Sequence, residues 1–172
     1  MNINIYSMDK AVEILTNDPK ANMISIASSK ERFGPNACSI DQNIFLNAPN
    51  CLLLFFDDIW NKSQENYGRT ISSYDEIRSV LEWVKDRDDI NVHCKMGISR
   101  SSAIAYIIAC SRMDPKKAIK ILNPNIHSPN ILIIKQGAEI LKDPSIVTEF
   151  VKYENSNIGM FTYNRFSINK GQ

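Results

Sequence analysis

Short apolar segments alternate with longer amphipathic ones along most of this chain. Five segments have the length and apolar content of β-strands: residues 2–6, 23–27, 43–46, 51–56 and 90–93. Five others carry apolar residues at helical spacing: residues 8–15, 73–85, 101–110, 115–122 and 130–142. Ser7, Ser72 and Asp114 stand where helix N-caps are expected. This alternation predicts an α/β fold with a short, mostly parallel central sheet flanked by helices.

Two of these segments are unusually apolar. Residues 51–56 are all apolar, which is typical of a strand covered on both faces, and they stop at Asp57-Asp58. Residues 101–110 are apolar nearly all round, which predicts a central, buried helix. Residues 28–42, which include Gly34-Pro35-Asn36 and Cys38, and residues 59–69 are predicted loops. Residues 1–172 are expected to form one domain, with the polar last twenty or so residues unassigned and peripheral.

Composition limits the classes of function. The chain is 44% hydrophobic and 23% charged, with a net charge of +1, so no broad electrostatic attraction to nucleic acid or a membrane is expected. Its four cysteines show no metal-ligand spacing, so a zinc site is not expected, and no cofactor is predicted. No signal-peptide pattern and no apolar run of membrane-spanning length occur. We therefore expect a cytoplasmic monomer with reduced thiols.

The segment with the clearest chemistry is residues 93–101, which read His-Cys-Lys-Met-Gly-Ile-Ser-Arg-Ser. A predicted strand enters it and the buried helix leaves it, a geometry that turns backbone N–H groups toward an anion. Gly97 supplies the backbone freedom that a tight curl needs at its middle position. The predicted phosphate-binding residues are Lys95, Met96, Gly97, Ile98, Ser99 and Arg100.

Four side chains of this segment have predicted roles. The thiolate of Cys94, stabilised by the N–H groups and the helix N-terminus, is the candidate nucleophile. Arg100 can hold two phosphate oxygens at once, and Ser101 can donate to the sulfur when the thiolate leaves. His93 is expected to hydrogen-bond neighbouring backbone and shape the loop. A cysteine and an arginine six apart are common, but the whole set predicts a cysteine-dependent phosphatase.

Such an enzyme also needs an acid to protonate the leaving oxygen. Asp57 and Asp58 follow the most apolar strand, and both would lie at the phosphate-binding rim if that strand neighboured the motif strand. Adjacent residues point different ways, so only one can face the loop. We predict that Asp58, which begins the turn, is the acid and that Asp57 supports it. Asp41 or a residue of the 60–69 loop is next in line.

The segment from His93 to Ser101 matches HCxxGxxR[ST], the signature of the protein tyrosine phosphatase superfamily. The compact length resembles the dual-specificity branch. Phe56-Asp57-Asp58-Ile59, the run from Gly97 to Ala103 and Ser128-Pro129-Asn130 make it similar to small bacterial predicted protein tyrosine phosphatases. The resemblance implies the cysteine-phosphatase fold, a cysteinyl-phosphate intermediate, no metal and an aspartate acid. It favours Asp58 and assigns Cys94, Arg100 and Ser101 the roles given above.

The sequence leaves the substrate open. The leading hypothesis is a phosphoprotein phosphatase acting on phosphotyrosine, with or without phosphoserine and phosphothreonine. A nucleotide, an RNA 5′ end or an inositol phosphate is the alternative substrate. Lys95 also occurs in phosphoinositide-directed relatives, but Ile98 stands where they carry a second lysine. A module that binds phosphorylated partners without turnover is a third hypothesis, and a sulfurtransferase is the least favoured.

Overall fold

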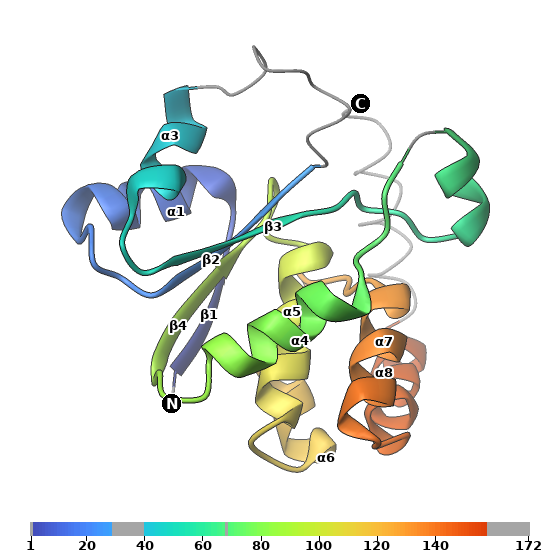
Figure 1. Ribbon diagram of the computed structural model, residues 1–172. Coiled ribbons are helices and arrows are strands. Elements are labelled where there is room, and N and C mark those ends of the chain that lie inside the picture. The colour runs from blue at the N-terminus through green and yellow to red at the C-terminus, as the bar shows by residue number, and fades with distance from the viewer. Residues whose placement is uncertain (1, 29–39, 68, 158–172) are drawn as a thin grey trace.

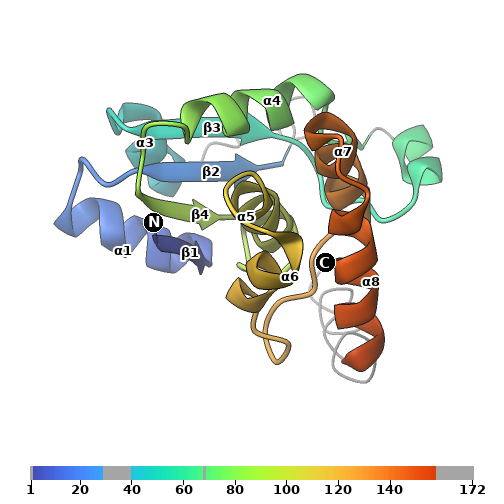
Figure 2. The same ribbon diagram turned by 90° about the horizontal axis from the view of Figure 1, so that it is seen from below.

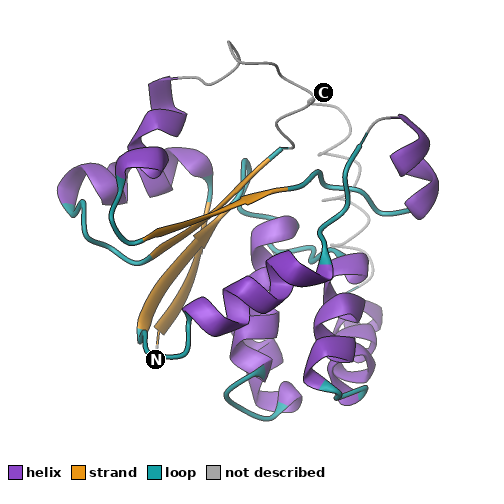
Figure 3. Cartoon of the chain, in the orientation of Figure 1, coloured by secondary structure: helices purple, strands orange, loops and turns teal. Residues whose placement is uncertain are grey.

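The computed structural model describes residues 2–28, 40–67 and 69–157. Four parallel strands form its sheet in the order β1-β4-β2-β3. They are β1 (Asn2–Tyr6), β4 (Asp89–His93), β2 (Met23–Ala27) and β3 (Cys51–Phe55). The sheet lies between helices, as Figure 3 shows in orange and purple. The predicted α/β architecture is confirmed, and the four strands described are all parallel.

Helices cover both faces of the sheet (Figures 1 and 2). On one face, α1 (Met8–Asn17) and α3 (Ile40–Asn47) enclose a small apolar cluster with Met23. The larger cluster on the other face includes Ile24 and Ile26, because alternate side chains of β2 point to opposite faces. Helices of that side are α4 (Tyr74–Trp83), α5 (Arg100–Cys110), α6 (Pro115–Ala118), α7 (Ile131–Leu141) and α8 (Ser145–Ser156).

Helix α5 is the centre of this core, as the sequence predicts. Every residue from Arg100 to Ala109 is buried. The hydroxyl of Tyr106 donates to the Ile146 carbonyl oxygen of α8 at 3.0 Å, so the one phenol inside the helix is satisfied. A helix packed on all sides holds its N-terminus in a fixed position. Residues 93–101, the phosphate-loop motif, end at this N-terminus.

The predicted strand at residues 43–46 is wrong, because these residues belong to helix α3. Ile44, Phe45 and Ala48 all join the small cluster beside α1, and their spacing of one and four residues defines one side of a helix. Four residues are too few to separate the two periodicities, and packing against Leu15 of α1 decides between them.

The N-cap of α4 is Ser73 and not Ser72. Ser73 and Glu76 form a complete capping box, in which each side chain bonds the other residue's backbone N–H. The hydroxyl of Ser72 is buried and donates to Gln136 of α7, whose amide nitrogen returns a bond of 2.6 Å to the Ser72 carbonyl. A tertiary contact therefore removes Ser72 from the capping position.

Other predicted elements are close to those observed, with three additions. Predicted helix 115–122 is α6 followed by a 3₁₀ turn at Ile119–Ile121, and loop 59–69 contains a 3₁₀ helix at Lys62–Tyr67. Helix α8 was not predicted from the sequence. Cys38, most of the predicted 28–42 loop and the chain after residue 157 lie outside the described residues.

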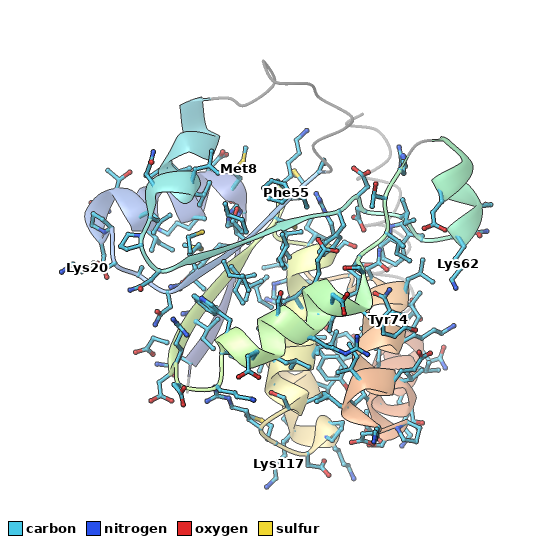
Figure 4. All side chains as sticks on the ribbon, viewed as in Figure 1. Met8, Lys20, Phe55, Lys62, Tyr74 and Lys117 are labelled. Atoms are coloured by element: carbon cyan, nitrogen blue, oxygen red, sulfur yellow. The ribbon has the colours of Figure 1, made fainter. Side chains whose placement is uncertain are left out.

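The carboxyl ends of the parallel strands lie at the same end of the sheet, where Tyr6 pairs with His93 and Ala27 with Phe55. In Figure 4, Met8 and Phe55 lie toward this upper end, while Lys117 lies at the lower end. Lys117 is therefore remote from the end of the sheet at which the strands terminate. Strand β3 is at the sheet edge, and β2 separates it from β4, so the motif strand and the Asp57-Asp58 strand are not neighbours.

Candidate active site

The phosphate-loop motif forms a tight loop between β4 and α5. Gly97 at its middle has a φ of 72°, in the left-handed region that favours glycine. A Cβ atom there would lie 2.6 Å from the carbonyl carbon of Tyr6 and 2.7 Å from the backbone nitrogen of Ser7. Glycine is therefore required twice over, for its backbone conformation and for the close approach of the β1–α1 connection.

Carbonyl groups of the loop have partners outside it. The carbonyl of Lys95 accepts from Met8 N at 3.2 Å, and that of Ile98 accepts from Ser128 N at 3.0 Å. Ser102 Oγ donates to the carbonyl oxygens of Ile98 and Ser99 at 2.5 and 2.9 Å. Because a trans peptide points its N–H opposite to its C=O, these contacts turn the following N–H groups toward the interior of the loop.

The N–H groups of residues 95–100 have no protein acceptor within the described ranges. Gly97, Ser99 and Arg100 are buried, and buried backbone donors are nearly always paired, so donors without partners at this loop indicate a place for a ligand. The first-turn donors of α5 extend the row and add the positive end of the helix dipole. The loop can therefore bind a tetrahedral oxyanion through its backbone.

Cys94 lies at the base of this loop and is only 3% exposed. Its Sγ is 3.2 Å from Ser101 Oγ, so the serine hydroxyl can donate to a thiolate. Cys51 and Cys110 are the other cysteines whose positions are described, and burial, the largest cause, raises the pKa of each to about 12. Neither of these two thiols ionises near neutral pH, and neither lies in the loop.

The guanidinium of Arg100 is buried, with 6% of the residue exposed. Nη1 donates to the Phe56 carbonyl oxygen at 2.8 Å, while Nε has no partner in the described part of the chain. No carboxylate of the described residues forms an ion pair with Arg100. A buried cation without a counter-ion is costly, and a bound phosphate would supply the missing negative charge.

The two aspartates that follow β3 have different surroundings. Asp58 Oδ1 accepts hydrogen bonds from Ser99 Oγ at 2.8 Å and from Asn130 Nδ2 at 2.9 Å, which holds the carboxyl group beside the phosphate loop. Asp57 is bonded within its own segment: its N–H donates to the Thr70 carbonyl, and its Oδ2 accepts from Thr70 N at 3.0 Å. Asp57 thus closes the 57–70 loop. Asp58 reaches the phosphate loop even though β3 is not next to β4 in the sheet.

His93 is buried and stacks on Phe45 of α3, with ring centroids 4.3 Å apart. Its ring interacts with the Cys94 backbone, as the sequence predicts, although neither nitrogen makes a well-aligned hydrogen bond to a described residue. Burial, reinforced by the Arg100 charge, lowers the pKa of His93 to about 4. Burial also lowers the pKa of His127 to about 4. The neutral imidazole of His93 packs against Phe45 and the Cys94 backbone, and its lowered pKa makes it a weak base.

The structure thus brings Cys94, Arg100, Ser101 and Asp58 together at the carboxyl end of the parallel strands. The side chains of Lys95 and Met96 are exposed, so these two residues meet the loop interior through their N–H groups. Sequence reasoning missed two contributions, the hydroxyl of Ser99 and the amide of Asn130. The Ser128-Pro129-Asn130 motif was the available signal for Asn130, but nothing local connects it to Asp58.

Comparison with solved structures identifies the fold. The structure of PTPMT1 in complex with PI(5)P is similar to this chain with a TM-score of 0.53, 12% identity and coverage of 82% of this chain and 90% of that one. A mouse putative dual specificity phosphatase (TM-score 0.48, 18% identity, 81% and 82% coverage) and Tk-PTP (TM-score 0.47, 15% identity, 85% and 90% coverage) are weaker matches. No family model and no curated protein sequence matches the chain.

The chain therefore shares the fold of PTPMT1, and the predicted α/β fold class is confirmed. None of the helices in the described residues is long and apolar enough to cross a bilayer.

Proposed function

We propose that this protein is a cysteine-dependent phosphatase that hydrolyses phosphate monoesters through a cysteinyl-phosphate intermediate, with phosphotyrosine in proteins as its main substrate. The observation that carries the proposal is the loop above Cys94. Its N–H groups have no protein acceptor, and the buried guanidinium of Arg100 has no counter-ion among the described residues. A dianionic phosphoryl group satisfies both at once.

The reaction follows from the positions of four side chains. The Cys94 thiolate attacks phosphorus, an S–P bond forms, and the P–O bond to the leaving group breaks while Asp58 gives its proton to the leaving oxygen. Asp58, now a carboxylate, then takes a proton from water as the water oxygen attacks phosphorus. The S–P bond breaks, and Ser101, 3.2 Å from the sulfur, donates to the departing thiolate. Arg100 holds the charge that spreads over the phosphoryl oxygens.

Two side chains of the loop bear on the substrate. Met96 is 58% exposed and offers an apolar surface beside the phosphate site, which suits the ring of phosphotyrosine. Lys95 is also exposed and can pair with a second anionic group. PTPMT1, whose structure contains PI(5)P, has a similar fold, so a phosphoinositide is the second candidate.

A substrate panel tests the proposal. We expect hydrolysis of an aryl phosphate in the presence of excess EDTA, because the loop supplies its own cationic and N–H stabilisation of the transition state. A phosphotyrosine peptide should have a higher kcat/KM than matched phosphoserine and phosphothreonine peptides, a soluble phosphoinositide, a nucleotide or an RNA 5′ phosphate. Loss of activity with EDTA, or a preference for one of the non-protein substrates, contradicts the respective part of the proposal.

The assignment of the acid gives a second prediction. Asp58→Asn should lower kcat/KM for phosphotyrosine by about 10² or more, yet change hydrolysis of an activated aryl ester little, because a good leaving group needs no proton. The same variant should lose the basic limb of the pH–rate profile. Neither described histidine can produce that limb, because burial lowers the pKa of each to about 4.

Asp57→Asn is the matched control. It keeps an oxygen that can accept from Thr70 N, so it should keep both the leaving-group selectivity and the basic limb. The reverse behaviour of the two variants would move the acid by one residue. A basic limb retained in both would direct attention to Asp41 or the 60–69 loop.

A further inference from the structure

The carboxyl group of Asp58 is held from two distant parts of the chain, 41 and 72 residues away. Ser99 belongs to the phosphate loop, and Asn130 is the N-cap of α7. Both donate to the same oxygen, Oδ1, at 2.8 and 2.9 Å. Two donors that converge on one oxygen fix the rotation of the carboxyl group.

Both polar atoms of the Asn130 side chain, Oδ1 and Nδ2, make hydrogen bonds, and the residue is only 1% exposed. Its Oδ1 caps α7 by accepting from Leu132 N at 3.0 Å. Its Nδ2 donates to Asp58 Oδ1 and, at 2.8 Å, to the Ile59 carbonyl oxygen. Because the amide is planar and its oxygen is committed to the helix, its nitrogen can only face the segment that carries the acid.

Ser99 contributes the second donor in an unusual way. A serine at a helix N-cap normally accepts from an N–H of the first turn. Ser99 occupies that position in α5 but makes no such bond, and its hydroxyl donates to Asp58 instead. The first-turn N–H groups of α5 are thereby left for a ligand, and the hydroxyl is used to hold the acid.

We propose that Asn130 is a positioning residue for proton transfer, which together with Ser99 makes Oδ1 of Asp58 the accepting oxygen and leaves Oδ2 to carry the proton. This inference rests on the proposed function. In a neutral carboxylic acid one oxygen bears the hydrogen and the other only accepts, and in the carboxylate both accept. The two bonds to Oδ1 therefore persist in both protonation states, and Oδ2–H gives its proton to the leaving oxygen without rearrangement of the loop.

The topology explains why such a residue is needed. Strand β3 lies at the sheet edge, and β2 separates it from the strand that leads to Cys94. The segment that carries Asp58 must therefore cross the end of β2 to reach the phosphate loop. Asn130 links this segment to the start of α7, which fixes the approach of the acid and removes an entropic cost from proton transfer.

The test introduces Asn130→Ser into the wild-type protein and into the Asp58→Asn variant, and compares each product with its parent. Serine retains an oxygen that can cap α7 but is too short to reach Asp58. We expect kcat/KM for a phosphotyrosine peptide to fall about 10- to 100-fold, and for an activated aryl phosphate less than about threefold. In an Asp58→Asn background, Asn130→Ser should cause no further selective loss, because it acts through the acid.

A second variant covers the case in which Asn130→Ser fails to fold. Asn130→Asp has the same length and retains the cap, but it turns a carboxylate oxygen toward Asp58 Oδ1. Since a nearby like charge disfavours ionisation of the acid, the basic limb of the pH–rate profile should move to higher pH by about half a unit or more. The charged side chains of Arg100, Asp57 and Lys95 are unchanged in both variants.

Ser73→Ala is the control for loss of a helix cap, because it removes the capping box of α4 without touching Asp58. It should lower thermal stability but leave the leaving-group dependence unchanged. Equal losses on both esters, an added loss in the Asp58→Asn background, or an unmoved basic limb in Asn130→Asp overturns the inference while the proposed function stands. If Asp58→Asn itself shows no leaving-group selectivity, the proposed acid is wrong, and the inference fails with it.

Discussion

Cys94→Ser should abolish turnover, lowering kcat by about 10⁴-fold or more, because the proposed intermediate requires a nucleophile that ionises and leaves readily. A serine hydroxyl ionises far less readily than a thiol, and burial lowers the pKa of the adjacent His93 to about 4, which makes this imidazole a weak base. Binding of phosphate or vanadate should persist, because the N–H groups of residues 95–100 and Arg100 are unchanged. Isothermal titration calorimetry and a steady-state assay measure the two properties separately.

Cys110→Ser is the matched control. Cys110 lies at the other end of α5, and burial raises the pKa of its thiol to about 12. Its replacement should leave kcat/KM within about twofold of wild type, apart from any change in the folded fraction. Substantial turnover by Cys94→Ser would exclude the cysteinyl-phosphate intermediate.

Arg100→Lys should lower kcat/KM by roughly 10² to 10³, although the charge is kept. A planar guanidinium can hold two phosphoryl oxygens while its Nη1 stays on the Phe56 carbonyl, and a lysine ammonium cannot do both. The loss should be greater in kcat than in phosphate affinity, because the charge on the equatorial oxygens develops in the transition state. Kinetics on an aryl phosphate and competitive inhibition by phosphate separate the two effects.

Arg112→Lys serves as the comparison at the opposite end of α5. Arg112 also donates to backbone carbonyls, those of Val84 and Lys85, but it lies just beyond the C-terminal end of α5, away from Cys94. This variant should lose some thermal stability and keep its kcat/KM. Near-normal catalysis by Arg100→Lys would show that the guanidinium does not bind the transferred phosphoryl group.

The phosphate loop was predictable because its parts are adjacent in sequence. Residues 93–101 contain the end of a strand, a curled loop with glycine at its centre and the start of a buried helix. Strand-loop-helix geometry is local, so the positions of Cys94 and Arg100 relative to the N–H groups follow from the motif itself. The burial of α5 was equally readable, because a helix that is apolar on every side must lie inside the core.

Errors arose where local patterns were short or where a distant contact decided. The apolar pattern of residues 43–46 fits both a strand and a helix. Packing of Phe45 against α1 and His93 makes these residues helical. Ser72 and Ser73 are both good N-caps, and the bond from Ser72 to Gln136 of α7 leaves Ser73 to cap. In each case, a contact that spans much of the chain selected one of two locally acceptable conformations.

The sequence alone thus predicted the candidate nucleophile, the arginine, the glycine-centred loop and the α/β class, because each depends on spacing within a few residues. Only the tertiary structure decided how the acid reaches the site. Strand order is a property of the whole sheet, so the edge position of β3 could not be read from its own residues. The hydrogen bonds from Ser99 and Asn130 to Asp58 join segments 41 and 72 residues apart, which only folding brings within reach.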